Sequence, residues 1–364
     1  MCIRDRYESI RPFLQLLHEA ACDPDVVSIK MTLYRLANHS KVVDALVEAA
    51  ENGKQVDVLV ELKARFDEEN NIEWSRLLER AGCHVVYGIE GLKVHSKLCL
   101  ITRKTKEGIS FITQIGTGNY NEKTSRLYTD LSFLTASKEI GLEATEVFRA
   151  LDQGETVDSV KNLLVAPHCL QNRLLNRIDG EIKAAARGEG GYIGIKINSL
   201  TDKVLINKLI EASQAGVYID MVVRGICCLK TGPRPNGKVI RVVSIVDRYL
   251  EHARIFFFHH GGNHQLFIAS ADWMTRNLDK RVELMVPVIN GRLARRLKSI
   301  LDACFRDNVQ ACNILPDGSS EHVVRKKGQK AFRLQQYLTK EARRLAKDKE
   351  RERQQMLEPH KPHE

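Results

Sequence analysis

The sequence contains no run of about 18 apolar residues, which is the length that a membrane-spanning helix needs. It also contains no Cys-x-x-Cys pair, although it has nine cysteines. An odd number of irregularly spaced cysteines is typical of reduced thiols in the cytoplasm and does not match the spacing of zinc ligands. We therefore expect a cytoplasmic protein with no transmembrane segment and no disulfide framework.

The first residues, MCIRDR, do not show the pattern of a signal peptide. They are polar and run directly into the helical pattern of residues 7–21. We expect residues 1–6 to be a non-native leader, joined to a chain whose N-terminal part is missing.

Positive charge exceeds negative charge, with 56 Lys and Arg against 46 Asp and Glu, which gives a formal net charge of +10. Such an excess favours polyanionic partners: nucleic acid, phosphorylated metabolites, phosphate polymers or an anionic membrane surface. Charge does not choose among them, so peripheral contact with a membrane stays open. The length of 364 residues is sufficient for two or three domains.

The first half of the chain alternates between two kinds of hydrophobic pattern. Residues 26–34, 55–62 and 83–88 are β-branched and apolar, as in buried strands. Residues 40–54 and 68–82 have apolar positions at helical spacing and end near glycine. Alternating strands and helices predict an α/β layer structure.

The second half repeats this order. Residues 191–202, 203–216 and 217–225 follow the pattern of 26–34, 40–54 and 55–62, and residues 115–134 align without a gap with 268–287. We therefore predict two tandem α/β domains related by an internal repeat, with mixed sheets flanked by helices. The expected divisions are 7–160 for the first domain, 161–320 for the second, and 321–364 for a charged C-terminal helix and tail.

Each repeat carries one histidine motif. The segment "GLKVHSKLCLI" (91–101) has the pattern of a buried strand but contains His95 and Lys97, and the matching segment "YLEHARIFFF" contains His252 and Arg254. Residues i and i+2 of a strand share a face, so each domain should present an imidazole beside a cation. A neutral imidazole can attack phosphorus, the cation can offset phosphate charge, and a second histidine can transfer a proton.

Paired His-x-Lys motifs resemble the phospholipase D superfamily, in which two repeats form one site. "GTGN" (116–119) resembles the turn and asparagine that follow the motif in that superfamily. The aspartate that completes the motif is replaced here by Thr102 and His259, and the second copy has arginine in place of lysine.

The closer resemblance is to the bacterial, ATP-dependent, histidine-phosphorylating polyphosphate kinases. It rests on "IKMTLYRLA", "VELKARFDEENNIEW", "GLKVHSKLCLI", "IGTGNYNEKTSRLYTDLSFLTA", "VVRGICCL", "SIVDRYLEHARIFFF" and "ASADWMTRNLDKRVE". The resemblance implies that the chain holds the two C-terminal phospholipase D-like domains of this family, and that the N-terminal and head domains are missing. It also implies reversible transfer of the ATP γ-phosphate to inorganic polyphosphate through a phosphohistidine.

The resemblance assigns roles to six positions. It makes His95 the phosphohistidine and His252 the second active-site histidine, which contacts nucleotide; it gives Tyr128 and Arg224 to ATP, and Arg35 and Arg65 to a Mg²⁺ site. A guanidinium has no lone pair, so we expect the two arginines to hold phosphate oxygens that themselves bind Mg²⁺. The repeat and its geometry add Lys97, Asn119 and Arg254 as supporting phosphate contacts.

The expected partners are ATP or ADP and inorganic polyphosphate, with Mg²⁺ as cofactor and no nucleic acid. The resemblance further implies a homo-oligomer for the full-length enzyme. Two alternatives remain open: a phospholipase D-like phosphodiesterase or nuclease, and an inactive polyanion-binding fragment.

Overall fold

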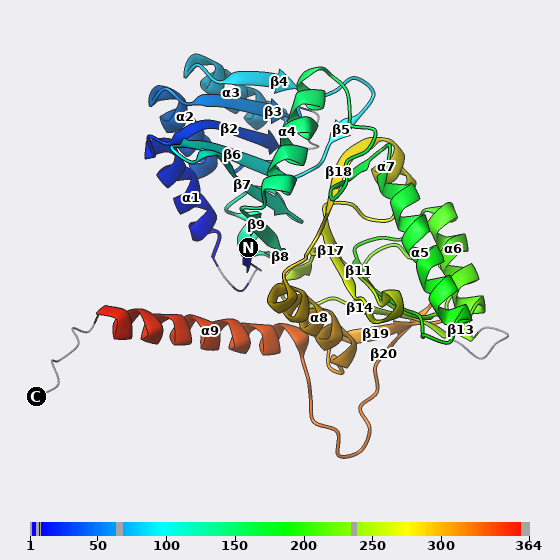
Figure 1. Ribbon diagram of the computed structural model, residues 1–364. Helices are drawn as coiled ribbons and strands as arrows, with labels where there is room; N and C mark the ends of the chain where they lie inside the picture. Colours follow the sequence, from blue (N-terminus) through cyan, green and yellow to red (C-terminus); the bar gives the residue numbers. More distant parts are fainter. Residues whose placement is uncertain (1, 5–6, 8, 63–67, 234–238, 358–364) are drawn as a thin grey trace, which may run out of the picture.

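The computed structural model describes all residues except 1, 5–6, 8, 63–67, 234–238 and 358–364. Two mixed β-sheets lie beside each other, each built mainly from one half of the chain and covered by helices (Figure 1). The predicted pair of tandem α/β domains is thereby confirmed. None of the described helices is long and apolar enough to cross a membrane.

The first domain contains a seven-stranded sheet. In spatial order its strands are β1 (Cys2–Arg4), β9 (Ser132–Thr135), β7 (Gly108–Gly116), β6 (Leu98–Thr105), β2 (Val26–Leu33), β3 (Gln55–Val60) and β4 (His84–Tyr87). Its helices are α1 (Arg11–Cys22), α2 (Lys41–Glu51), α3 (Glu68–Arg80) and α4 (Lys138–Asp152), with a 3₁₀ turn at Thr124–Arg126. Helices α1, α2 and α3 share one apolar core with the sheet, and α4 shares another.

The second domain is built around the larger sheet. Its main path runs through β10 (Leu164–Ala166), β18 (Arg281–Pro287), β17 (Gln265–Ala269), β16 (Ile255–Phe258), β11 (Tyr192–Ile197), β12 (Tyr218–Val223), β14 (Val239–Ile245), β19 (Ala311–Ile314) and β20 (Ser320–His322), and β13 (Gly232–Pro233) pairs with β14. The helices are α5 (Leu170–Ala186), α6 (Lys203–Gln214), α7 (Thr275–Asp279), α8 (Gly291–Arg306) and α9 (Leu334–Leu357), with a 3₁₀ turn at His260–Gly262.

The two sheets follow the same topology. The order β10-β18-β17-β16-β11-β12-β14 in the second domain corresponds to β1-β9-β7-β6-β2-β3-β4 in the first. In both, the central pair of strands is parallel and the next strand on one side is antiparallel. The predicted internal repeat is therefore present in the strand order as well as in the sequence.

One apolar core is shared by both domains. It includes Leu98 and Phe133 from the first sheet and Phe257 and Leu284 from the second. Helices α4 and α8 also contribute side chains to it. Since this core is continuous, the boundary between the domains is a packed interface, and it fixes the two histidine motifs relative to each other.

Helix α9 leaves the body of the molecule (Figure 1). Its beginning packs closely through Leu334, Leu338 and Ala342, and the described side chains from 343 to 348 are exposed or half-buried. Ahead of the helix, Arg333 forms an ion pair with Asp247.

Gly141 allows α4 to lie close against the sheet. A Cβ atom at this position would stand 2.4 Å from the Cβ and Cγ of Phe111 on β7. We expect Gly141→Ala to lower the free energy of unfolding by about 1–3 kcal/mol, because the clash outweighs the gain in helix propensity of about 1 kcal/mol.

The matched control is Gly180→Ala in α5. A Cβ there would have His260 Nδ1 as its nearest neighbour, at 3.6 Å, which is ordinary contact. This variant should be as stable as the wild type or slightly more stable. Denaturant unfolding measures both, and a Gly141→Ala protein as stable as the wild type would contradict the prediction.

Candidate active site

Each histidine motif lies where the chain crosses between the domains. His95 follows β5 (Lys93–Val94), which pairs with β18 of the second domain, and its backbone N donates to Val282 O at 3.0 Å. His252 follows β15 (Leu250–Glu251), which pairs with β8 (Tyr128–Thr129) of the first domain. Its backbone N donates to Thr129 O at 3.1 Å.

This arrangement corrects the prediction of one continuous strand over residues 91–101. Residues 95–97 lie outside any strand, as do residues 252–254 in the second copy. The reason is that each segment first pairs with the opposite domain and only then joins the sheet of its own domain.

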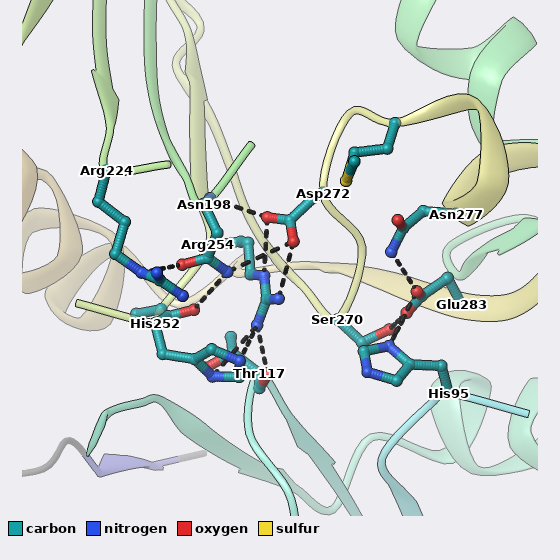
Figure 2. A network of polar contacts seen from close by, with 12 residues as sticks. His95, Thr117, Asn198, Arg224, His252, Arg254, Ser270, Asp272, Asn277 and Glu283 are labelled. Atoms are coloured by element: carbon teal, nitrogen blue, oxygen red, sulfur yellow. Dashed lines mark hydrogen bonds and ion pairs between the residues drawn. The ribbon is translucent and has the colours of Figure 1, made fainter. Parts of the chain in front are cut away.

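His95 is held by a carboxylate from the other domain (Figure 2). Its Nδ1 lies 2.9 and 3.0 Å from the two carboxylate oxygens of Glu283, whose side chain is fully buried. Glu283 also accepts hydrogen bonds from Ser270 Oγ at 2.5 Å and from Asn277 Nδ2 at 2.6 Å. These bonds fix the carboxylate, and the carboxylate in turn fixes the plane of the imidazole.

His252 is held in the same way by the first domain. Its Nδ1 lies 2.7 and 3.0 Å from the oxygens of Asp130, which also accepts a hydrogen bond from Thr117 Oγ1 at 2.7 Å. Each domain thus supplies one histidine to the site and the carboxylate that holds the histidine of the other domain.

Burial acts on both members of the His95–Glu283 pair, but it prevails only at His95. It lowers the pKa of His95 to about 3, although the neighbouring Glu283 acts in the opposite direction. Burial alone would raise the pKa of Glu283, but His95, Lys97 and Ser270 outweigh it and hold this pKa at about 2. An ionised carboxylate only accepts hydrogen bonds, so Nδ1 of the neutral imidazole carries the proton. The Nε2 atom keeps its lone pair.

The two cations of the motifs are buried and partnered. Lys97 is 1% exposed and its Nζ donates to the carbonyl of His95. Arg254 pairs with Asp272 through two bonds of 3.2 and 3.0 Å and donates to Thr117 O at 2.9 Å. Its Nη1 also lies 3.2 Å from Nε2 of His252. Figure 2 shows the guanidinium of Arg254 beside the imidazole of His252. Both cations therefore stand beside the histidines, and direct contact with phosphate stays a prediction.

The residues predicted for ATP gather around His252. The ring of Tyr128 lies 5.2 Å from the ring of His252, centroid to centroid. Arg224 follows β12, and its Nε donates to Asn198 Oδ1 at 2.9 Å and to Glu251 O at 2.6 Å. Asn119 lines a cavity together with Tyr128 and Asp130.

Arg35 lies on the side of His95. Its guanidinium stands 5.7 Å from the centre of the Tyr34 ring, and that ring meets the His95 ring edge-on at 4.9 Å. Tyr34 and Arg35 line an open cavity of about 950 Å³, to which four further cations contribute: Lys93, Arg276, Lys280 and Arg281. Arg65, the other predicted magnesium-site residue, lies outside the described residues.

Sequence reasoning missed the two carboxylates and the hydroxyl groups that support them. The ungapped alignment of residues 115–134 with 268–287 contained the signal, because it places Asp130 on Glu283 and Thr117 on Ser270. Acidic and hydroxyl side chains recur at matching places in both repeats.

The same domains occur in known proteins. The family model "Polyphosphate kinase C-terminal domain 1" matches residues 1–157, and "Polyphosphate kinase C-terminal domain 2" matches residues 163–335. Polyphosphate kinase of Rhodopirellula baltica is 46% identical over 98% of this chain and 42% of its own length; the enzyme of Halalkalibacterium halodurans is 50% identical over 84% and 43%.

A solved structure agrees with these matches. The crystal structure of polyphosphate kinase from Porphyromonas gingivalis aligns with a TM-score of 0.87 at 40% identity, over 96% of this chain and 53% of that one. The chain spans less than half the length of the two sequence relatives named above. It belongs to the polyphosphate kinase family, as its two C-terminal domains.

Proposed function

We propose that the chain carries the phosphoryl-transfer site of a polyphosphate kinase, with His95 as the nucleophile. The observation that supports this most directly is the bond between His95 Nδ1 and the buried carboxylate of Glu283. It leaves Nε2 with a free lone pair on a ring that is neutral at physiological pH.

The reaction has two steps at the same nitrogen. His95 Nε2 attacks the γ-phosphorus of ATP, the bond to the β-phosphate oxygen breaks, and ADP leaves. A terminal oxygen of polyphosphate then attacks the phosphohistidine, and His95 returns to its neutral form. The overall reaction exchanges one phosphoanhydride bond for another of similar energy, so the transfer is reversible.

His252 assists on the nucleotide side. Burial and then Arg254 lower its pKa, and Asp130 only partly opposes them. A neutral imidazole held through Nδ1 can accept or return a proton at Nε2. Tyr128 and Arg224 lie beside it and are suited to bind the nucleotide.

Polyphosphate fits the cavity next to His95. Five cations line it, namely Arg35, Lys93, Arg276, Lys280 and Arg281, against two carboxylates, Glu61 and Glu90. The cavity adjoins Tyr34, whose ring contacts His95. A linear polyanion bound there would end at the nucleophile.

Magnesium enters, on this proposal, as part of the nucleotide substrate. Arg35 has no lone pair for a metal, and Asp130 and Glu283 are already bonded to the two histidines. The described residues around the histidines therefore suit a Mg²⁺ ion that is carried on phosphate oxygens. The ion would neutralise phosphate charge as the bond to the γ-phosphate breaks.

One experiment separates this function from its two alternatives. The protein is incubated with γ-labelled ATP and Mg²⁺, and the label is tested for acid lability and base stability and mapped to its peptide. Label on the peptide that contains His95 supports the kinase. Hydrolysis of a phosphodiester without ATP would favour the phosphodiesterase, and polyphosphate binding without any label would favour the inactive fragment.

The charge of Lys97 should govern how kcat/KM for ATP changes on the alkaline side of the pH profile. Burial lowers the pKa of Lys97 to about 7, although Glu283 raises it in part. The ammonium is therefore present below this pH and is lost above it, together with its stabilisation of phosphate charge. We expect kcat/KM for ATP to fall as pH rises through about 7.

The matched variant is Lys97→Arg, because a guanidinium stays charged in this range. Its kcat/KM should remain level from about pH 6 to about pH 9, measured under the same conditions. Identical pH profiles for the wild type and Lys97→Arg would show that Lys97 does not control the fall of kcat/KM at alkaline pH.

A further inference from the structure

A group of side chains that can ligate a metal ion lies on helices α1 and α2, which cover the face of the first sheet opposite to α4 (Figure 1). His18 and Cys22 are four residues apart on α1, so they project from the same side of the helix. Glu48 faces them from α2. Its Oε2 lies 2.7 Å from His18 Nδ1, and its Oε1 accepts from Cys22 Sγ at 3.6 Å.

The three donor atoms are already close to a coordination geometry. One nitrogen, one sulfur and one oxygen lie within 4.8 Å of one another. Tetrahedral zinc with bonds of about 2.0–2.3 Å places its ligand atoms about 3.3–3.8 Å apart. To reach these spacings, side-chain rotation would lengthen the contact of 2.7 Å between His18 Nδ1 and Glu48 Oε2.

The chemistry of the three groups selects the ion. Imidazole, thiolate and carboxylate are all zinc ligands, whereas Mg²⁺ and Ca²⁺ prefer oxygen. The site is open to solvent, since His18 and Glu48 are 64% and 37% exposed, so water can complete the coordination. We propose that His18, Cys22 and Glu48 bind a Zn²⁺ ion, with water as the fourth ligand, and that the ion links α1 to α2.

This site is separate from the proposed phosphoryl-transfer site. None of its three ligands contacts His95, His252 or the carboxylates that hold them. Lys54 lies near Cys22, but its Nζ donates to the carbonyl of Asp23. The ion is proposed to act on the helices of the first domain, where it links α1 to α2.

Cobalt substitution tests the site directly. The protein is reduced, stripped of metal with a chelator and titrated with Co²⁺, whose bond to a thiolate gives a charge-transfer absorption in the near ultraviolet. We expect saturation at one equivalent and displacement by Zn²⁺. Cys22→Ser should lose the absorption, and His18→Ala and Glu48→Gln should weaken Zn²⁺ binding at least about tenfold.

Two further measurements complete the test. Zn²⁺ should raise the melting temperature of the wild type and of the control Cys228→Ser, which alters an exposed cysteine of the second domain, but not that of Cys22→Ser. Zn²⁺ should also slow the alkylation of Cys22. A wild type without a saturable thiolate–cobalt band, or a band that persists in Cys22→Ser, overturns the proposal. Labelling of His95 by γ-labelled ATP should be unchanged in all these variants. The zinc proposal and the proposed phosphoryl-transfer function can therefore fail independently of each other.

Discussion

The His95→Ala variant is expected to form no phosphoenzyme from ATP and to lose phosphoryl transfer by on the order of 10⁴-fold or more, because the attacking atom is removed. His252→Ala should behave differently. It removes a group that transfers a proton, so the label should still appear on His95, but about 10²–10⁴-fold more slowly. Rapid-quench measurement of acid-labile label in a single turnover gives both rates.

An exposed histidine of the second domain provides the control. His264 lies in the turn between β16 and β17 and has no contact with the site, so His264→Ala should label at the wild-type rate. Label that persists in His95→Ala would disprove the assignment of the nucleophile. Label lost only in His252→Ala would reverse the roles of the two histidines.

The Glu283→Gln variant is expected to lower the rate of His95 phosphorylation by about 10³–10⁴-fold, as removal of the negative charge from a catalytic His–Asp pair does in serine proteases. The carboxylate fixes the proton on Nδ1 because it can only accept a hydrogen bond. A glutamine amide can donate one instead. The imidazole would then carry its proton on Nε2, the atom that must attack phosphorus.

The tautomer itself can be observed. Nitrogen NMR of labelled histidine should show His95 protonated at Nδ1 in the wild type and largely at Nε2 in Glu283→Gln. Glu143→Gln is the matched control, since Glu143 accepts a hydrogen bond from Asn162 and forms no bond to either histidine. A wild-type rate in Glu283→Gln, or a slow rate with an unchanged tautomer, would rule out this positioning role.

The repeat carried most of the information that the sequence offered. Residues 191–225 follow residues 26–62 closely enough to predict two similar α/β domains, because alternating apolar strands and helices depend on local periodicity. The same repeat identified His95 and His252 as an equivalent pair. The repeat also places Asp130 and Glu283 at matching positions, but no local sequence pattern distinguishes them from ordinary acidic surface residues.

The contacts across the interface were beyond prediction from local pattern. His95 and Glu283 are 188 residues apart, and His252 and Asp130 are 122 residues apart. The core shared by the two domains and the strand pairs β5–β18 and β8–β15 bring these residues together. The break at residues 95–97 has the same origin, because a two-residue strand that pairs with another domain leaves no periodic signal.

Each active-site histidine is held by a carboxylate of the other repeat, and this has a consequence for how the two-repeat chain evolved. Each copy of the repeat contains a histidine and a carboxylate, yet no copy holds its own histidine. If a single-copy ancestor had the same geometry, it would have been functional only as a twofold dimer, with two identical half-sites exchanged between subunits. Fusion of the two copies would then have allowed the halves to diverge, so that one imidazole could take the proposed role of carrying phosphate and the other the proposed role on the nucleotide side.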